Sequence, residues 1–247
     1  MTDNCNRAPA RWAELRRFTP ARVALGRVGN GLPTTAHLAF QAAHAAARDA
    51  VHATLDVAVL RADLDAAHLP TIAVHSAAPD RRSYLLRPDL GRRLCDRAAI
   101  PRMPGAMLFV LCDGLSATAV QRHAVPLLQH LIPRLTGAVA PIVVAEQGRV
   151  ALGDDIGEAM GAEAVAVLIG ERPGLSAADS LGAYLTWQPR RGRTDAERNC
   201  ISNIRPDGMP PAAAADKILW LISAMRRLCL TGIALKDEYA SALPIAD

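Results

Sequence analysis

Three apolar stretches of the sequence each end in polar side chains that could bind a ligand. The stretches and the polar residues after them are 106–111 with Asp113, 141–145 with Glu146, Gln147 and Arg149, and 164–169 with Glu171 and Arg172. Carboxylates, an amide and guanidinium groups together offer both hydrogen-bond acceptors and donors. The chemistry that they indicate is recognition of a polar ligand.

Motifs of a self-contained catalyst are missing from the sequence. All seven histidines fall at or before His130, so nothing signals a Cys-His pair that would activate Cys200. Ser116 lies in DGLSA, which is not the GxSxG pattern of a nucleophilic serine. The segment GRVGNG departs from the GxGxxG spacing of dinucleotide sites, and neither HExxH nor Walker A occurs. We therefore expect no catalytic residue in this chain.

Histidines and cysteines do not form a metal-binding pattern. His37, His44 and His52 are seven and eight residues apart on one expected helix. At 1.5 Å per residue this separates them by about 11–12 Å, too far to share a metal ion. The five cysteines are widely spaced and odd in number, with no CxxC pair. We expect no metal site and interpret the cysteines as reduced thiols in a cytosolic protein.

Charge and hydropathy argue against two classes of partner. The net charge is only +4, the arginine pairs are scattered, and aromatic residues make up 4%, too few for a platform on which bases stack. No apolar run approaches the ~20 residues that span a bilayer. The N-terminus also lacks the apolar segment of a signal peptide. We therefore expect a cytoplasmic protein that binds neither nucleic acid nor membrane.

Strands and helices that would position the polar groups can be placed from periodicity. The expected strands are 71–76, 106–111, 141–145, 164–169 and 184–188, and the expected helices are 36–53, 57–69, 88–99, 117–135, 153–161, a turn at 177–182, and 212–230. Their alternation predicts an α/β fold with a parallel sheet and helices on both faces. The polar groups then share the carboxyl edge of the sheet, where such folds bind ligands.

Two polar segments leave alternatives open, and one linker divides the chain. The turn 170–174, GERPG, is either a functional loop or an ordinary surface turn, and 192–205 reads as a long loop that is either functional or a solvated connection.

Residues 100–105 hold two prolines and a glycine, which is typical of a linker. We therefore expect an N-terminal arm, 1–20, a mainly helical domain, 21–104, and a ligand-contacting domain, 105–247.

The motifs, in order, closely resemble one family, the light chain (small subunit) of ethanolamine ammonia-lyase. The matching stretches are ARVALGRVGNGLPTTAHLAFQAAHAAARDAV, YLLRPDLGRRL, DGLSATAV, EQGRVALGDDIGE, LIGERPGL, SLGAYLTW and ERNCISNIRPDG. They are colinear and cover most of residues 21–235. GERPGL and CISNI together are specific to this family.

This resemblance implies a function that spacing alone does not show. The family's enzyme converts ethanolamine to acetaldehyde and ammonia with adenosylcobalamin, which heavy and light chains hold between them. The heavy chain carries the substrate site, so this chain is expected to form a hetero-oligomer and to be inactive alone. The family's fold is a helical N-terminal domain followed by a Rossmann-like parallel sheet with helices on both faces.

Site residues and location also follow from the resemblance. The family's cobalamin contacts carry over as Val150 in GRV, Glu171 in GERPG and Cys200 in NCISN, and no DxHxxG is present, which implies that the cofactor keeps its own lower axial base. Packaging in a bacterial microcompartment stays open. Two rival hypotheses also remain: a stand-alone nucleotide-binding enzyme of Rossmann-like fold, and a purely structural partner subunit.

Overall fold

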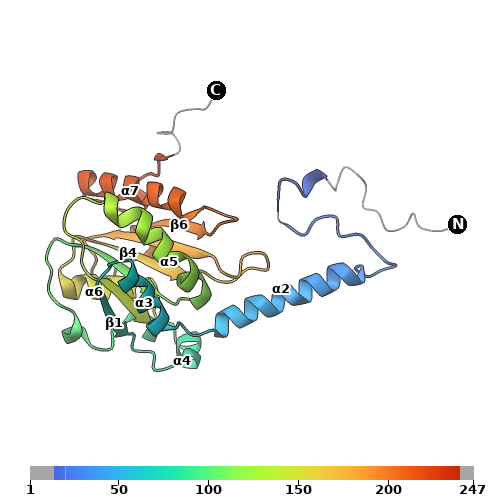
Figure 1. Ribbon diagram of the computed structural model, residues 1–247, viewed down its shortest axis with the longest axis horizontal. Coiled ribbons are helices and arrows are strands. Elements are labelled where there is room, and N and C mark those ends of the chain that lie inside the picture. Colours follow the sequence, from blue (N-terminus) through green and yellow to red (C-terminus); the bar gives the residue numbers. More distant parts are fainter. Residues whose placement is uncertain (1–13, 20, 240–247) are drawn as a thin grey trace.

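Six strands form one sheet in the computed structural model of the chain, which describes residues 14–19 and 21–239 (Figure 1). The strands are β1 (Thr71–His75), β2 (Met107–Cys112), β3 (Ile142–Glu146), β4 (Ala164–Gly170), β5 (Leu181–Trp187) and β6 (Asn199–Ile204). Their order across the sheet is β1-β3-β2-β4-β5-β6. The α/β class is therefore confirmed.

Strand direction changes within the sheet. β1, β3, β2 and β4 run parallel, whereas β5 is antiparallel to both of its neighbours, β4 and β6. The prediction of a wholly parallel sheet is thus wrong at this end. The reason is the short connection 171–180, which holds no helix, because parallel neighbours need a crossover of about a dozen residues or more.

The strand β6 corrects a second expectation, that 192–205 is a loop. Only Ile201 and Ile204 of this strand are buried, and the other four residues are half-buried or exposed. As the last strand in the sheet, β6 has a neighbour on one side only. Its polar composition therefore reflects an edge position rather than a loop.

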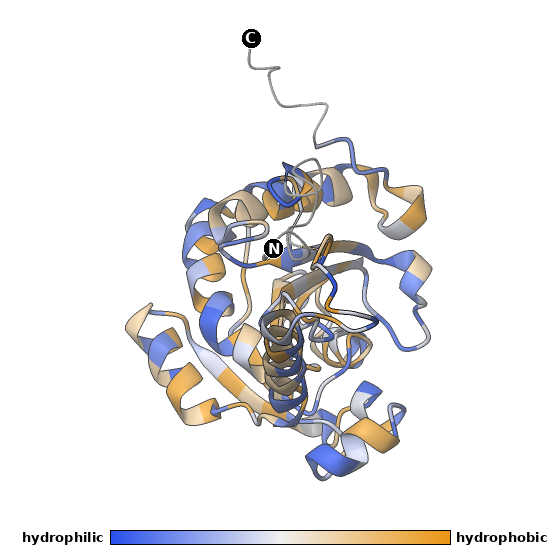
Figure 2. Cartoon of the chain, turned by 90° about the vertical axis from the view of Figure 1, so that its right-hand side faces the viewer, coloured by the Kyte–Doolittle hydropathy of each residue, from blue (hydrophilic) through white to orange (hydrophobic). Residues whose placement is uncertain are grey.

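Helices cover both faces of the sheet and also extend beyond it. They are α2 (Thr34–His52), α3 (Val57–Ala66), α4 (Arg81–Leu86), α5 (Ala117–Leu131), α6 (Leu152–Met160) and α7 (Pro211–Leu228). Single 3-10 turns lie at Leu90–Arg92, Arg97–Ala99, Ile132–Arg134, Asp195–Glu197 and Gly232–Ala234. Figure 2 shows both hydrophilic and hydrophobic residues on the helices around the sheet, as expected where a helix has one face toward a core and one toward solvent.

The expected helix over 88–99 does not form. A shorter helix, α4, ends before Pro88, and two 3-10 turns replace the rest. Proline disfavours helical geometry in the residue before it, and Arg87 is outside the helical region, with φ −126° and ψ 76°. Backbone groups of the segment bond elsewhere instead: Leu94 donates its N–H to the Asp155 carboxylate at 2.8 Å.

Two cores lie on opposite faces of the sheet. On β2, Met107, Phe109 and Leu111 face a cluster that includes residues of α5 and α7, and the alternate residues Leu108, Val110 and Cys112 face α6. All six residues of β2 and all seven of β4 are buried. Each large apolar side chain buried in this way contributes about 1.5–3 kcal/mol. This explains why both strands are unbroken apolar runs in the sequence.

The N-terminal helix α2 differs from the other long helices. It extends away from the sheet (Figure 1), and Ala50 is the one buried residue among its nineteen. Arg81 holds its C-terminal end, because the Arg81 Nε donates to the Val51 carbonyl oxygen at 2.8 Å. The strand β1, which precedes the expected domain boundary, pairs with β3. The division into arm and two domains stays a prediction, and residues 1–13 and 20 of the arm lie outside the described residues.

Candidate ligand site

A buried carboxylate, Asp113, organises the carboxyl edge of the sheet. It follows β2, is 1% exposed, and accepts hydrogen bonds from the backbone N–H groups of Gly114 (2.9 Å), Gln147 (3.0 Å) and Gly148 (3.0 Å). Burial raises the pKa of the Asp113 carboxyl, while Arg81, at 3.3 Å, and the three N–H groups oppose this. Asp113 therefore faces the protein, where it holds the turn after β3, and not a ligand.

The turn after β3 is held from three further directions. Ser76 donates to the Gln147 carbonyl oxygen at 2.7 Å, and the Tyr84 hydroxyl donates to the Gly148 carbonyl oxygen at 3.2 Å. The Arg149 N–H donates to the Gly91 carbonyl oxygen at 2.8 Å. A Cβ atom at Gly91 would lie 2.9 Å from Arg149 Cγ, so glycine lets the two backbones approach. The turn that carries Arg149 and Val150 is thus firmly positioned.

A cavity of about 520 Å³ opens at the end of β4, beside this turn. Its lining combines apolar side chains, two tyrosines and charged or hydroxyl groups. Among these residues are Leu115, Val150, Ile169, Tyr84, Tyr184, Arg149, Glu171, Arg172 and Ser202. The expectation that polar groups from separate strand ends meet at one edge is confirmed for Arg149, Glu171 and Arg172.

Glu171 uses one of its two carboxylate oxygens to fix its own position. The Oε2 atom accepts hydrogen bonds from the Ser180 hydroxyl and from the backbone N–H of Asn203, the latter at 3.1 Å. Among the described residues, nothing donates a hydrogen bond to Oε1. Glu171 therefore lines the cavity in a fixed orientation with one oxygen free to accept a hydrogen bond from a ligand.

Cys200 lies next to the cavity rather than in its lining. It is opposite Tyr184 in the pairing of β6 with β5, and Tyr184 lines the cavity. The residue is exposed, yet partial desolvation by the surrounding protein raises the pKa of its thiol, with Tyr184 opposing and Glu171 adding to the shift. The structure therefore brings Val150 and Glu171 to one cavity and places Cys200 beside it.

Several lining residues escape prediction from the sequence. Tyr84 comes from α4, far from the strand ends in sequence, and no local pattern marks it. Ser202 lies on strand β6, where the buried residues Ile201 and Ile204 are three positions apart, so the alternation typical of a strand is absent from the sequence. Tyr184 was expected at the start of a strand, but its place opposite Cys200 depends on the antiparallel pairing.

The described residues show no group of three or more histidine, cysteine or acidic side chains placed to hold a metal ion. Within the same part of the chain, none of the helices has the length and apolar character needed to cross a membrane. Four of the five cysteines are described, and all four are free thiols. The arrangement is a cavity with an apolar wall and a mixed set of hydrogen-bond donors and acceptors.

Comparison with known proteins gives consistent results. Residues 9–236 match the family model described as "Ethanolamine ammonia-lyase light chain (EutC)". Three curated relatives named "Ethanolamine ammonia-lyase small subunit" illustrate the similarity. They are those of Pseudomonas syringae pv. tomato (52% identical, covering 94% of this chain and 85% of the relative), Azotobacter vinelandii (53%, 96% and 92%) and Ralstonia nicotianae (51%, 100% and 97%).

Proposed function

The chain belongs to the ethanolamine ammonia-lyase light-chain family, and on this premise we propose that its sheet edge forms half of an adenosylcobalamin site. A heavy chain supplies the other half and the substrate site. The observation that supports this proposal is the cavity beside β4, where Val150 and Glu171 meet next to Cys200. We keep the proposed division of the chain, in which residues 105–247 form a Rossmann-like second domain. All residues that line the cavity belong to that domain except Tyr84.

The donor set of the cavity suits a corrinoid. A corrin ring has a broad apolar face and a rim of amide side chains, which both donate and accept hydrogen bonds. Val150 and Ile169 provide an apolar surface, and the free Oε1 of Glu171 would accept from an amide N–H or a ribose hydroxyl. Cys200 would contribute a backbone group or a soft contact, because its raised pKa keeps the thiol protonated near neutral pH.

This chain's own residues bind and orient, and they perform no bond-breaking step. When bound, the cofactor supplies radical chemistry through homolysis of its cobalt–carbon bond. Glu171 is already braced by Ser180 and Asn203, so it would meet the cofactor without losing much side-chain freedom. The apolar wall would exclude water from the face that it covers.

Reconstitution tests the proposal. The purified chain is expected to lack lyase activity, and the activity should appear only with heavy chain and adenosylcobalamin together. In that complex, Glu171→Ala should lower the affinity for cyanocobalamin by about tenfold, the effect of losing one hydrogen bond to a charged group. Asp63→Asn, at an exposed acidic residue of α3, is the matched control and should change nothing.

The same experiment separates the rival hypotheses. A purely structural subunit predicts that Glu171→Ala weakens assembly of the complex while the assembled complex binds cobalamin with unchanged affinity. A stand-alone enzyme predicts that the purified chain binds nucleotides, although CDGLSA after β2 is not a GxGxxG fingerprint. Either result would overturn the proposal. Location in a microcompartment remains a separate proposal, tested by fractionation of the source cells.

A further inference from the structure

A second hollow, which we call the arginine cleft, lies beside the cavity of the proposed site. Its volume is about 730 Å³. Six arginines line it, namely Arg92, Arg93, Arg149, Arg191, Arg193 and Arg198, against only two acidic residues, Asp154 and Asp195. Guanidinium groups recognise phosphate and carboxylate oxygens through paired hydrogen bonds. The composition of the lining therefore favours an anionic ligand.

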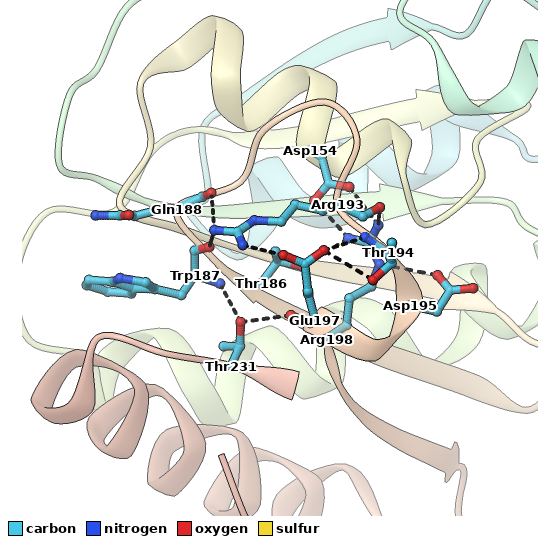
Figure 3. A network of polar contacts seen from close by, with 10 residues as sticks. All are labelled: Asp154, Thr186, Trp187, Gln188, Arg193, Thr194, Asp195, Glu197, Arg198 and Thr231. Atoms are coloured by element: carbon cyan, nitrogen blue, oxygen red, sulfur yellow. Dashed lines mark hydrogen bonds and ion pairs between the residues drawn. The ribbon is translucent and has the colours of Figure 1, made fainter. Parts of the chain in front are cut away.

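Ion pairs within the chain neutralise three of these arginines. The pairs are Arg198 with Asp154 (2.8 Å), Arg193 with Glu197 (2.5 Å) and Arg191 with Asp155 (2.7 Å). Figure 3 shows the first two within a network around the loop after β5. Thr231 closes the network, since its hydroxyl donates to the Glu197 carbonyl oxygen at 2.9 Å and accepts from the Trp187 N–H at 3.1 Å. One wall of the cleft is thereby fixed.

The other three arginines, Arg92, Arg93 and Arg149, form no ion pair within the described residues, and Arg93 acts on the Asp89 carboxylate only at longer range. Arg149 stacks on the Tyr84 ring, with its guanidinium carbon 4.2 Å from the ring centroid, and its Nε is buried without a hydrogen-bond partner. Arg92 and Arg93 are exposed. The cleft therefore carries positive charge that no ion pair among residues 14–19 and 21–239 balances.

The position of Arg149 connects the cleft to the proposed cofactor cavity. Arg149 and Val150 line both hollows. A ligand seated in the cavity could thus extend an anionic group past Val150 into the cleft. The volume of the cleft also exceeds the need of a bare phosphate ion and lies in the range of pockets for larger ligands.

We propose that the arginine cleft binds the phosphodiester in the nucleotide tail of the cobalamin, with Arg92, Arg93 and Arg149 as its cationic partners. This inference rests on the proposed function, because it assumes that the corrin ring occupies the neighbouring cavity. It assigns the two hollows different parts of one ligand. The cavity takes the corrin ring, and the cleft takes the single negative charge of the tail.

Two corrinoids test the assignment in the complex with the heavy chain. Cyanocobalamin carries the phosphodiester, and dicyanocobinamide has the corrin ring without it. The double variant Arg92→Gln/Arg93→Gln changes exposed residues, so the fold should survive, and Arg149→Gln removes the central cation. Affinities are measured by absorbance titration at constant ionic strength, because salt screens exposed charges. Arg227→Gln, at an exposed arginine of α7 outside the cleft, is the matched control.

Selective loss is the expected result. The double variant should bind cyanocobalamin about tenfold more weakly and dicyanocobinamide with unchanged affinity, as for the loss of a charge-assisted hydrogen bond. Arg149 also lines the cavity, so Arg149→Gln should weaken the binding of both corrinoids, and that of cyanocobalamin more. Inorganic phosphate should compete with cyanocobalamin in the unmodified complex and not with dicyanocobinamide. A cleft that holds free phosphate instead of the tail would give phosphate binding that cyanocobalamin does not displace, and this would overturn the assignment.

Other outcomes identify which proposal has failed. If the cleft variants lose affinity for both corrinoids equally, or for neither of them, the proposed role of the cleft is wrong. Weaker assembly with unchanged corrinoid affinities would do the same and would indicate an acidic segment of the heavy chain as the occupant. Glu171→Ala distinguishes the underlying proposal: if it leaves the affinities for both corrinoids unchanged, the cofactor site itself is misplaced.

Discussion

Helices α5 and α2 differ in how many of their residues are buried. The helix α5 buries nine of its fifteen residues against the sheet and α7, whereas α2 buries one of nineteen. Packing therefore stabilises α5. The helix α2 depends on its alanine-rich sequence, since alanine has the highest helix propensity, and on the contact of Arg81 with its last turn.

The difference extends to the regions around the two helices. At the sheet edge, the Asp113 carboxylate is buried and accepts hydrogen bonds from four donors, three of them backbone N–H groups. Along α2, large apolar side chains such as Leu38 and Phe40 are exposed. Substitutions should therefore have large effects on stability at the edge and small effects on α2.

The largest effect is expected at Gly170, the last residue of β4. A Cβ atom there would overlap the backbone carbonyl of Ser116, which cannot move without shifting the start of α5. Gly170→Ala should cost about 3 kcal/mol or more of the free energy of unfolding, measured by urea denaturation. At Gly174 the nearest atom would lie 3.9 Å away, so Gly174→Ala should stay within about 0.5 kcal/mol. Equal stability of the two variants would show that the edge is not rigid.

Asp113→Ala should have an effect on stability of about the same size. It removes the acceptor for three backbone N–H groups and leaves the guanidinium of Arg81 without its carboxylate. Loss of one partner from a buried pair costs about 3–5 kcal/mol. Asp89→Ala breaks an exposed pair with Arg87, which solvent screens, and should leave the stability almost unchanged. Thermal unfolding of both variants provides the comparison, and a small loss for Asp113→Ala would contradict its anchoring role.

Protonation of Glu197 should have a smaller effect on stability, and this effect should depend on pH. The Thr194 backbone N–H, and then Arg193, lower the pKa of Glu197 from 4.5 to about 2. A lowered pKa in the folded state means that ionised Glu197 stabilises its loop above pH 4.5 and that this stabilisation is lost as the pH falls through about 2. The protection factor of the Thr194 amide against hydrogen exchange, which corrects for the intrinsic pH dependence of exchange, should therefore fall over this range. Glu197→Gln should remove that dependence, and identical pH profiles would refute it.

Leu38→Ala on α2 should have the smallest effect. The side chain is 57% exposed, so its truncation removes little packing, and stability should change by less than about 0.5 kcal/mol. Leu128→Ala on α5 removes a fully buried side chain and should cost about 2–5 kcal/mol. Urea denaturation of the isolated chain measures both. If the two variants lose a comparable amount of stability, packing does not distinguish α5 from α2.

Three strands of the sheet were predictable because burial on both faces gives a recognisable pattern in the sequence. The strands β2, β3 and β4 are each within one residue of the expected 106–111, 141–145 and 164–169. A strand between two cores must be apolar at every position, and few other structures impose that pattern in so short a run. The expected helix at 36–53 is confirmed as α2 for a different reason, its alanine content.

Features that depend on pairing were not predictable. The direction of β5 and the existence of β6 follow from which strand lies next to which, and single-strand composition does not carry this information. At the site, the convergence of Arg149, Glu171 and Arg172 follows from the general geometry of open sheets. Tyr84 reaches the cavity only because Gly91 allows its segment to pack against the turn after β3.

The short turn that carries Arg149 and Val150 has a consequence for engineering. Both residues line both hollows, and the two residues before them, Gln147 and Gly148, are held by hydrogen bonds with Asp113, Ser76 and Tyr84. A designer who reshapes one hollow through this turn therefore also reshapes the other. Independent adjustment must begin from the far walls, at Ser202 for the cavity and at Arg92 or Arg93 for the cleft.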